Sequence, residues 1–141
     1  MKNHLFHLLP KSDTVFLANT DSYRQAYNMF ILTNYAALPV INKKGQYIGT
    51  ICEGDLLRVL SLSLSHPEIN LDSFEVKDIE FKTKVQVAKV NESFEHLVEL
   101  AVTQNFIPLV DDLGVFIGIL RRQELIKELI SFLSVKVAER K

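Results

Sequence analysis

The sequence predicts an α+β protein in which two tandem β-α-β-β-α repeats pack as one module with pseudo-two-fold symmetry. Three observations support this prediction. A short apolar segment containing proline occurs twice, at 37–41 and 106–110, so that the two prolines lie 69 residues apart. A glycine-containing apolar segment follows each copy at the same offset, at 47–51 and 116–120. An amphipathic pattern precedes each copy. Features repeated in one order at nearly one spacing indicate an internal duplication.

The amphipathic patterns predict the first helix of each repeat. Apolar residues recur at the i, i+3, i+4 and i+7 positions of one helical face. Ser22 and Gln25 have the form of a capping box and so place the start of the first helix. Asn91 or Ser93 is expected to cap the second. The apolar positions are Tyr23, Ala26, Tyr27, Phe30 and Ile31 in the first copy, and Phe94, Leu97, Val98, Ala101 and Val102 in the second.

The remaining elements follow from composition. Short leading strands are expected at 15–17 and 85–87, and the two apolar segments of each repeat read as strands rich in β-branched residues. Gly45 and Gly114 close polar turns between those strands. The closing helices are expected to begin near Asp55 and Glu124.

We expect three segments along the chain: a first repeat with its N-terminal segment at 1–64, a connection at 65–75, and a second repeat with a C-terminal helix at 76–141. Neither repeat is large enough to bury its apolar faces well alone, so the two are expected to form one structural module.

Composition excludes several classes of function. Hydrophobic residues make up 48% of the 141 residues, which argues against disorder. The net charge of −1 offers no basic excess for nucleic-acid binding. Cys52 is the single cysteine, which fits a reducing compartment, and no apolar run is long enough to span a bilayer. A cytoplasmic protein without membrane or nucleic-acid partners is expected.

The duplicated pattern resembles the CBS-domain pair, or Bateman module, over almost the whole chain. Each repeat has a helix, an x-Pro-Val-like strand, a glycine turn, an Ile-Gly strand and an acidic residue that opens a helix. The resemblance is closest to small bacterial proteins that consist only of the pair. The segments that carry it are 9–12, 35–40, 53–57 and 105–108.

The resemblance implies a regulatory protein that binds AMP, ADP, ATP or cyclic di-AMP between its repeats, without a cofactor and without catalysis. It also implies a homodimer formed through helices, with a possible protein target. In the family, a motif Gly-h-h-Ser/Thr-x-x-Asp supplies a hydroxyl for phosphate and a carboxylate for ribose. The residues before the proline and the leading strand hold the base.

The chain departs from that motif in both copies. Cys52 replaces the hydroxyl in the first copy, which keeps Asp55. Arg121 replaces it in the second, where Glu124 replaces the aspartate. Arg121 and Arg122 lie where phosphate is expected, and guanidinium groups bind phosphate oxygens in pairs. The alternative is that both arginines are solvated charges.

We therefore expect one stronger and one weaker site. The stronger combines Thr14, Phe16, Tyr35, Ala36 and Ala37 with Arg121, Arg122 and Glu124. The weaker combines Cys52 and Asp55 with Val85, Val87, Asn105 and Phe106. Tyr35 either stacks on adenine or is a core aromatic, and Phe106 is better explained by core packing.

Other functions have less support in the sequence. An interaction or scaffolding module with degenerate ligand sites is the main alternative, favoured by Cys52 and Arg121. No phosphate loop or nucleophile–base pair indicates an enzyme. No metal site is expected: His4 and His7 read as solvated tail residues, and Asp111-Asp112 as part of a turn.

Overall fold

The computed structural model describes residues 8–139, with side chains through residue 134. The chain forms two compact units. The repeat-1 unit contains residues 15–85 and 113–116, and the repeat-2 unit contains residues 8–14, 86–112 and 117 onward. Within the described residues, every helix is too short or too polar to cross a membrane. Two repeats of mixed α and β structure confirm the predicted fold class.

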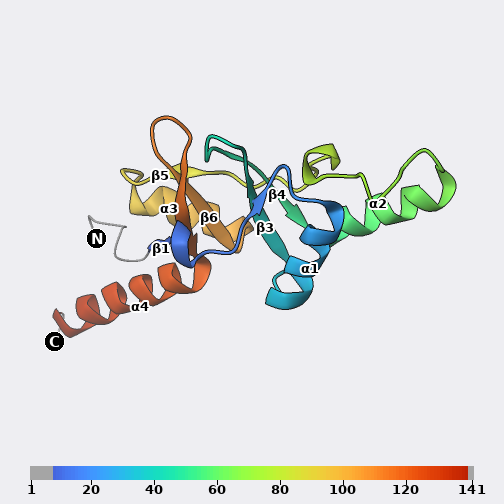
Figure 1. Ribbon diagram of the computed structural model, residues 1–141. Coiled ribbons are helices and arrows are strands. Elements are labelled where there is room, and N and C mark those ends of the chain that lie inside the picture. The colour runs from blue at the N-terminus through green and yellow to red at the C-terminus, as the bar shows by residue number, and fades with distance from the viewer. Residues whose placement is uncertain (1–7, 140–141) are drawn as a thin grey trace. The chain divides into compact units, whose positions relative to one another are not determined.

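The repeat-1 unit has a three-stranded sheet in the order β2-β3-β4. Its strands β3 and β4 are labelled in Figure 1. β2 pairs in parallel with β3, and β3 pairs antiparallel with β4. A short 3-10 helix, η3 (Val76–Asp78), follows the connection. The elements are β2 (Leu17–Ala18), α1 (Tyr23–Thr33), β3 (Ala37–Ile41), β4 (Tyr47–Cys52) and α2 (Glu53–Ser65).

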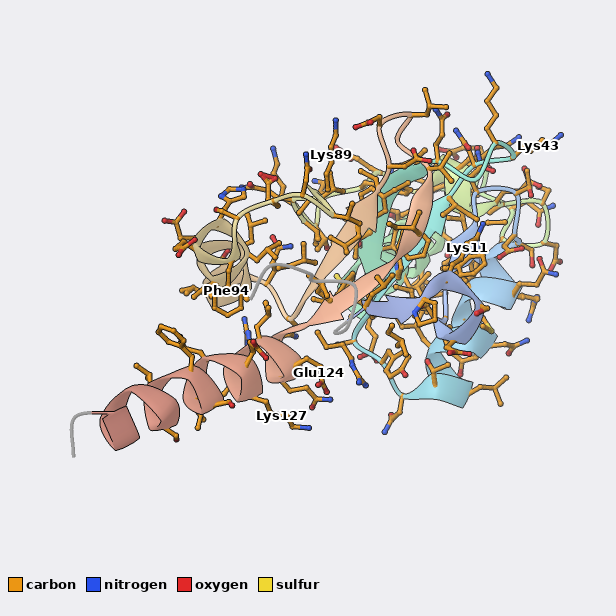
Figure 2. All side chains as sticks on the ribbon, turned by 90° about the vertical axis from the view of Figure 1, so that its left-hand side faces the viewer. Lys11, Lys43, Lys89, Phe94, Glu124 and Lys127 are labelled. Carbon is orange, nitrogen blue, oxygen red and sulfur yellow. The ribbon has the colours of Figure 1, made fainter. Side chains whose placement is uncertain are left out.

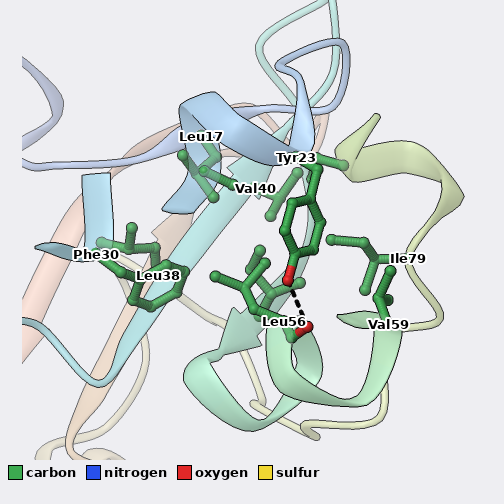
Figure 3. Close-up of a cluster of buried hydrophobic side chains, with 11 residues drawn as sticks. Leu17, Tyr23, Phe30, Leu38, Val40, Leu56, Val59 and Ile79 are labelled. Atoms are coloured by element: carbon green, nitrogen blue, oxygen red, sulfur yellow. Dashed lines mark hydrogen bonds between the residues drawn. The ribbon is translucent and has the colours of Figure 1, made fainter. Parts of the chain in front are cut away.

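The core of this unit lies where α1 and α2 meet the sheet (Figure 3). Leu17, Leu38 and Val40 are fully buried from the strand side. The Tyr23 hydroxyl donates a 2.6 Å hydrogen bond to the Leu56 carbonyl, so the one polar group of this aromatic is satisfied inside the core. Burial, with a smaller contribution from Tyr27, raises the pKa of the Tyr23 phenol.

The repeat-2 unit has a four-stranded sheet in the order β1-β7-β6-β5. β5 pairs in parallel with β6, as β2 does with β3 in the first repeat. A 3-10 helix, η2 (Lys11–Asp13), follows the first strand. The elements are β1 (Leu8–Pro10), β5 (Ala88–Lys89), α3 (Phe94–Thr103), β6 (Phe106–Val110), β7 (Phe116–Arg121) and α4 (Arg122–Glu139).

The predicted helix starts are confirmed at the caps. The Ser22 hydroxyl accepts from the Gln25 backbone and the Gln25 side chain accepts from the Ser22 backbone, which completes the capping box. Ser93, rather than Asn91, caps α3 by accepting from the His96 backbone. The closing helices begin two residues earlier than expected, at Glu53 and Arg122.

The predicted leading strands at 15–17 and 85–87 were wrong in position, because pairing starts later. The parallel ladders begin at Leu17, opposite Val40, and at Ala88, opposite Leu109. In the second repeat, the backbone of Gln86 is hydrogen-bonded to the Gln104 side chain instead of to a strand.

The N-terminal strand belongs with the second repeat rather than the first. β1 pairs antiparallel with β7, so that Leu8 lies opposite Leu120 and Pro10 opposite Gly118. The compact units differ from the predicted segments at three places: residues 8–14 lie in the repeat-2 unit, and residues 76–85 and 113–116 lie in the repeat-1 unit.

Two glycines lie so close to other parts of the chain that a side chain would not fit at either position. Gly118 has φ 152°, and a Cβ there would overlap the carbonyl oxygen of Leu9. A Cβ on Gly49 would overlap the ring of Phe81. Both positions therefore require glycine for packing within their own units.

We expect Gly118→Val to destabilise the protein strongly and Gly54→Ala not to. The first change places a β-branched residue at positive φ, which costs about 1–3 kcal/mol from backbone strain alone, and displaces β1 as well. The second adds a methyl within α2, where only the Cys52 sulfur is near, and should stabilise by about 0.5–1 kcal/mol. Urea unfolding measures both changes, and equal effects would contradict this account of Gly118.

Candidate functional site

The acidic motif of each repeat is tied to the loop before its proline strand by the same backbone hydrogen bond. The Glu53 N–H donates to the Ala36 carbonyl at 3.2 Å, and the Arg122 N–H donates to the Asn105 carbonyl at 2.9 Å. Within each repeat, the start of the closing helix is therefore held beside residues that the sequence predicted to face a base.

Arg121 and Glu124 form a partly exposed ion pair at the start of α4. Arg121 ends β7 and Glu124 lies in the first turn of α4 (Figure 2). The Arg121 guanidinium donates to the Glu124 carboxylate at 3.3 Å, and the Lys127 ammonium lies 3.7 Å from the same oxygen. The Glu124 side chain is 23% exposed and that of Arg121 is 44% exposed, so both are accessible to a polar ligand.

Arg122 has a structural role that neither sequence alternative included. Its Nε donates to the Ala101 carbonyl at 2.7 Å, and its Nη2 donates to the Val102 carbonyl at 3.4 Å. These carbonyls belong to the last turn of α3, where helix carbonyls lack intrahelical partners. The Arg122 guanidinium therefore caps α3 and is less available to phosphate than that of Arg121.

A groove of about 300 Å³ lies beside this cap, between α3 and α4. Its walls are aliphatic except for Arg122, which gives the groove little polar chemistry with which to orient a ligand. This groove was not predicted from the sequence. The lining residues are Val98, Ala101, Val102, Arg122, Leu125, Ile126 and Leu129.

Asp55 of the first repeat is buried and already hydrogen-bonded. It is 3% exposed. Its Oδ2 accepts from the Cys52 backbone at 2.8 Å and from the Thr83 hydroxyl at 3.2 Å, while its Oδ1 accepts from Arg58 at 3.3 Å. The Thr83 hydroxyl also lies 3.2 Å from the Cys52 sulfur. The Asp55 carboxylate therefore holds the start of α2 together.

The base-facing residues predicted for the stronger site have mixed surroundings. The Thr14 hydroxyl lies 2.8 Å from the Pro10 carbonyl and 3.2 Å from that of Leu9. Phe16 packs edge-on against Phe116, with centroids 6.1 Å apart. The Tyr35 side chain is 51% exposed, which argues against the core alternative for this residue.

The predicted residues fall in different units. Phe16, Tyr35, Ala36 and Ala37 belong to the repeat-1 unit, whereas Thr14, Arg121, Arg122 and Glu124 belong to the repeat-2 unit. The structure brings Arg121 and Glu124 together, and it places Ala36 against the start of α2. Their combination into one site stays a prediction.

The weaker set is similarly divided. Cys52, Asp55 and Val85 lie in the repeat-1 unit, and Val87, Asn105 and Phe106 in the repeat-2 unit. Phe106 is partly buried, whereas Asn105 and Val87 are exposed. Gln104, which precedes Asn105 and is buried, was not predicted as a site residue. Its burial is visible only in the structure, so the sequence held no signal for it.

Metal-binding chemistry has no cluster to support it in the described residues, where no three His, Cys, Asp or Glu side chains gather. Asp112 instead forms an ion pair with Lys89 at 3.2 Å. His4 and His7 lie outside the described residues.

Comparison with known families identifies the family to which this chain belongs. The model of the CBS domain matches residues 7–62 and again residues 76–131. This chain belongs to the CBS-domain family. The two matches coincide with the two repeats, which confirms the predicted resemblance to a CBS-domain pair.

Similar proteins share this organisation. An uncharacterized protein of Methanocaldococcus jannaschii, MJ1426, is 30% identical over 72% of this chain and 77% of its own length. The CbpB protein of Listeria monocytogenes in complex with cyclic di-AMP has a TM-score of 0.77 at 20% identity, covering 93% of this chain and 97% of CbpB. CBSX2 in complex with AMP has a TM-score of 0.75 at 19% identity, covering 94% and 98%.

We expect Arg122→Ala to lower the free energy of unfolding by about 1–2 kcal/mol, because two α3 carbonyls lose a charged donor. Arg121→Ala is the matched control: it breaks only a partly exposed ion pair and should cost less than about 1 kcal/mol. Thermal unfolding of both variants without ligand separates the two roles, and equal melting temperatures would contradict the capping role.

Proposed function

We propose that the protein is a regulatory sensor that binds an adenine nucleotide: AMP, ADP, ATP or cyclic di-AMP. The observation that carries the proposal is the accessible Arg121–Glu124 pair at the start of α4, within the second CBS motif. The structures of CbpB with cyclic di-AMP and of CBSX2 with AMP support the ligand class.

The chemistry of the pair suits a nucleotide. A guanidinium binds phosphate oxygens in a bidentate manner, and a carboxylate accepts from both ribose hydroxyls. A bound nucleotide therefore replaces one ion pair with two sets of charged hydrogen bonds. The base is assigned to residues that precede the proline strand of the first repeat and to its leading segment. These residues are Thr14, Phe16, Tyr35, Ala36 and Ala37.

Regulation follows from linkage. A ligand that binds one conformation or one partner-bound state more tightly shifts the population toward it. This role needs no catalytic group, and we propose no reaction. The free Cys52 is consistent with a reducing, cytoplasmic location, which we propose for the protein.

We expect Arg121→Ala to weaken nucleotide binding by about ten- to a hundredfold, because a hydrogen bond to a charged group contributes about 1.5–3 kcal/mol. Arg122→Ala should weaken it less, since that guanidinium caps α3. Arg24→Ala is the control: Arg24 also forms an exposed ion pair, with Asp72, but lies outside the proposed site. Calorimetric titration with AMP, ATP and cyclic di-AMP measures the affinities.

Two results would change the proposal. If wild type binds none of these nucleotides, the interaction-module alternative replaces the sensor. If wild type binds but Arg121→Ala and Arg24→Ala bind equally well, the site assignment fails while the nucleotide-binding function stands.

We also propose a homodimer formed through helices. Both units expose large apolar side chains on their helices, which a monomer leaves in water. In the repeat-1 unit these are Tyr27, Ile31, Leu32, Leu57, Leu60, Leu62 and Leu64. In the repeat-2 unit they are Val102, Ile126, Ile130, Phe132 and Leu133.

Sedimentation is expected to give twice the chain mass of 16.1 kDa at micromolar concentration. Ile126→Glu should shift the protein toward monomer, because it places a charge in the apolar helix surface. Leu113→Glu, on an exposed turn residue outside the helices, should leave the dimer intact. A wild-type monomer at this concentration would overturn the dimer.

A further inference from the structure

We infer that each chain binds one adenine base rather than two, because the side chain of Gln104 occupies the backbone edge with which the second repeat would recognise a base. The inference rests on the proposed nucleotide-binding function and specifies its stoichiometry.

Gln104 satisfies both main-chain polar groups of Gln86. The Gln86 N–H donates to Gln104 Oε1 at 3.2 Å, and Gln104 Nε2 donates to the Gln86 carbonyl at 2.9 Å. The same Nε2 also donates to the Phe106 carbonyl at 3.0 Å. Gln104 is 9% exposed, so this amide is a buried, fully engaged group. Gln86 lies between Val85 and Val87, which the sequence predicted to face a base.

The carboxamide resembles the edge of adenine in its hydrogen-bonding groups. Adenine presents an amino donor beside a ring-nitrogen acceptor, and glutamine presents an amide donor beside a carbonyl acceptor. A residue backbone has one donor and one acceptor, and at Gln86 both are bonded to Gln104. A base that pairs there has to displace Gln104 from both groups of Gln86 and leave the buried amide oxygen without that donor, which costs about 1–3 kcal/mol.

The first repeat lacks this amide. The residue 69 positions before Gln104 is Tyr35, whose phenol has no paired amide donor and acceptor. The Tyr35 side chain is 51% exposed, against 9% for Gln104. The two repeats therefore differ at this position. In the second repeat, the Gln104 amide occupies the backbone groups expected to recognise a base, whereas the first repeat has Tyr35 there.

The carboxylates Asp55 and Glu124 differ in how fully other groups of the chain engage them, and the carboxylate of the weaker set is again the more engaged. Asp55, assigned with the second repeat's base residues, is buried and accepts from Cys52, Thr83 and Arg58. Glu124, assigned with the first repeat's base residues, forms ion pairs with the long, flexible side chains of Arg121 and Lys127. In the weaker set, the Gln86 backbone and the Asp55 carboxylate thus both form hydrogen bonds with other groups of the chain, each within its own unit.

Calorimetric titration of wild type with AMP tests the inference directly. We expect one AMP per chain. Gln104→Ala should raise the stoichiometry from one toward two per chain, because it frees the Gln86 backbone. Gln86→Ala is the matched control: it removes an exposed amide from the same place but keeps the backbone groups that Gln104 contacts. It should stay at one.

A second variant keeps the test valid if Gln104→Ala does not fold. Gln104→Asn keeps the amide but withdraws it by one methylene, and it should likewise raise the stoichiometry. Adding Arg121→Ala to either variant should weaken the first binding event about ten- to a hundredfold and leave the new one.

The outcomes separate the inference from the function beneath it. Two AMP per chain in wild type overturns the inference and leaves the sensor function intact. A folded Gln104 variant that still binds one AMP also overturns it. If wild type and all variants bind none of AMP, ATP and cyclic di-AMP, both the inference and the sensor function are overturned.

Discussion

Antiparallel pairing of β1 with β7 is the constraint on which the repeat-2 unit depends. The strand from Leu8 to Pro10 completes the edge of this sheet, and its carbonyl at Leu9 lies so close to Gly118 that no side chain fits there. β7 ends at Arg121, and α4 begins at the next residue. The geometry of the Arg121–Glu124 pair is therefore set by a strand from the other end of the chain.

Much of the fold could be predicted because its signals are local. The Ser22–Gln25 capping box, the paired glycine turns and the proline strands each depend on neighbouring residues, and the duplication made every one of them visible twice. The leading strands were placed two to three residues too early because apolar runs at 15–17 and 85–87 do not say where a distant partner begins pairing. The location of β1 had no local signal.

The candidate site was less predictable, because the partners of a side chain are determined by the tertiary structure. Arg121 and Arg122 are adjacent in sequence, yet one forms an exposed ion pair and the other caps α3. Asp55 matched its family motif better than Glu124, yet it is the more fully engaged carboxylate. Motif matching identifies which residue types occupy a position, whereas burial and hydrogen bonds decide whether they are available.

The strand pairing described above also bears on how the chain folds during synthesis. Leu8 emerges from the ribosome long before its partner Leu120, which lies more than a hundred residues further along the chain. Closing a loop of that length is entropically slow, and contacts so distant in sequence form late. The repeat-1 unit, by contrast, draws nearly all its residues from one continuous stretch, 15–85. It is therefore expected to collapse while β1 is still unpaired, with an apolar strand edge exposed until β7 has been synthesised.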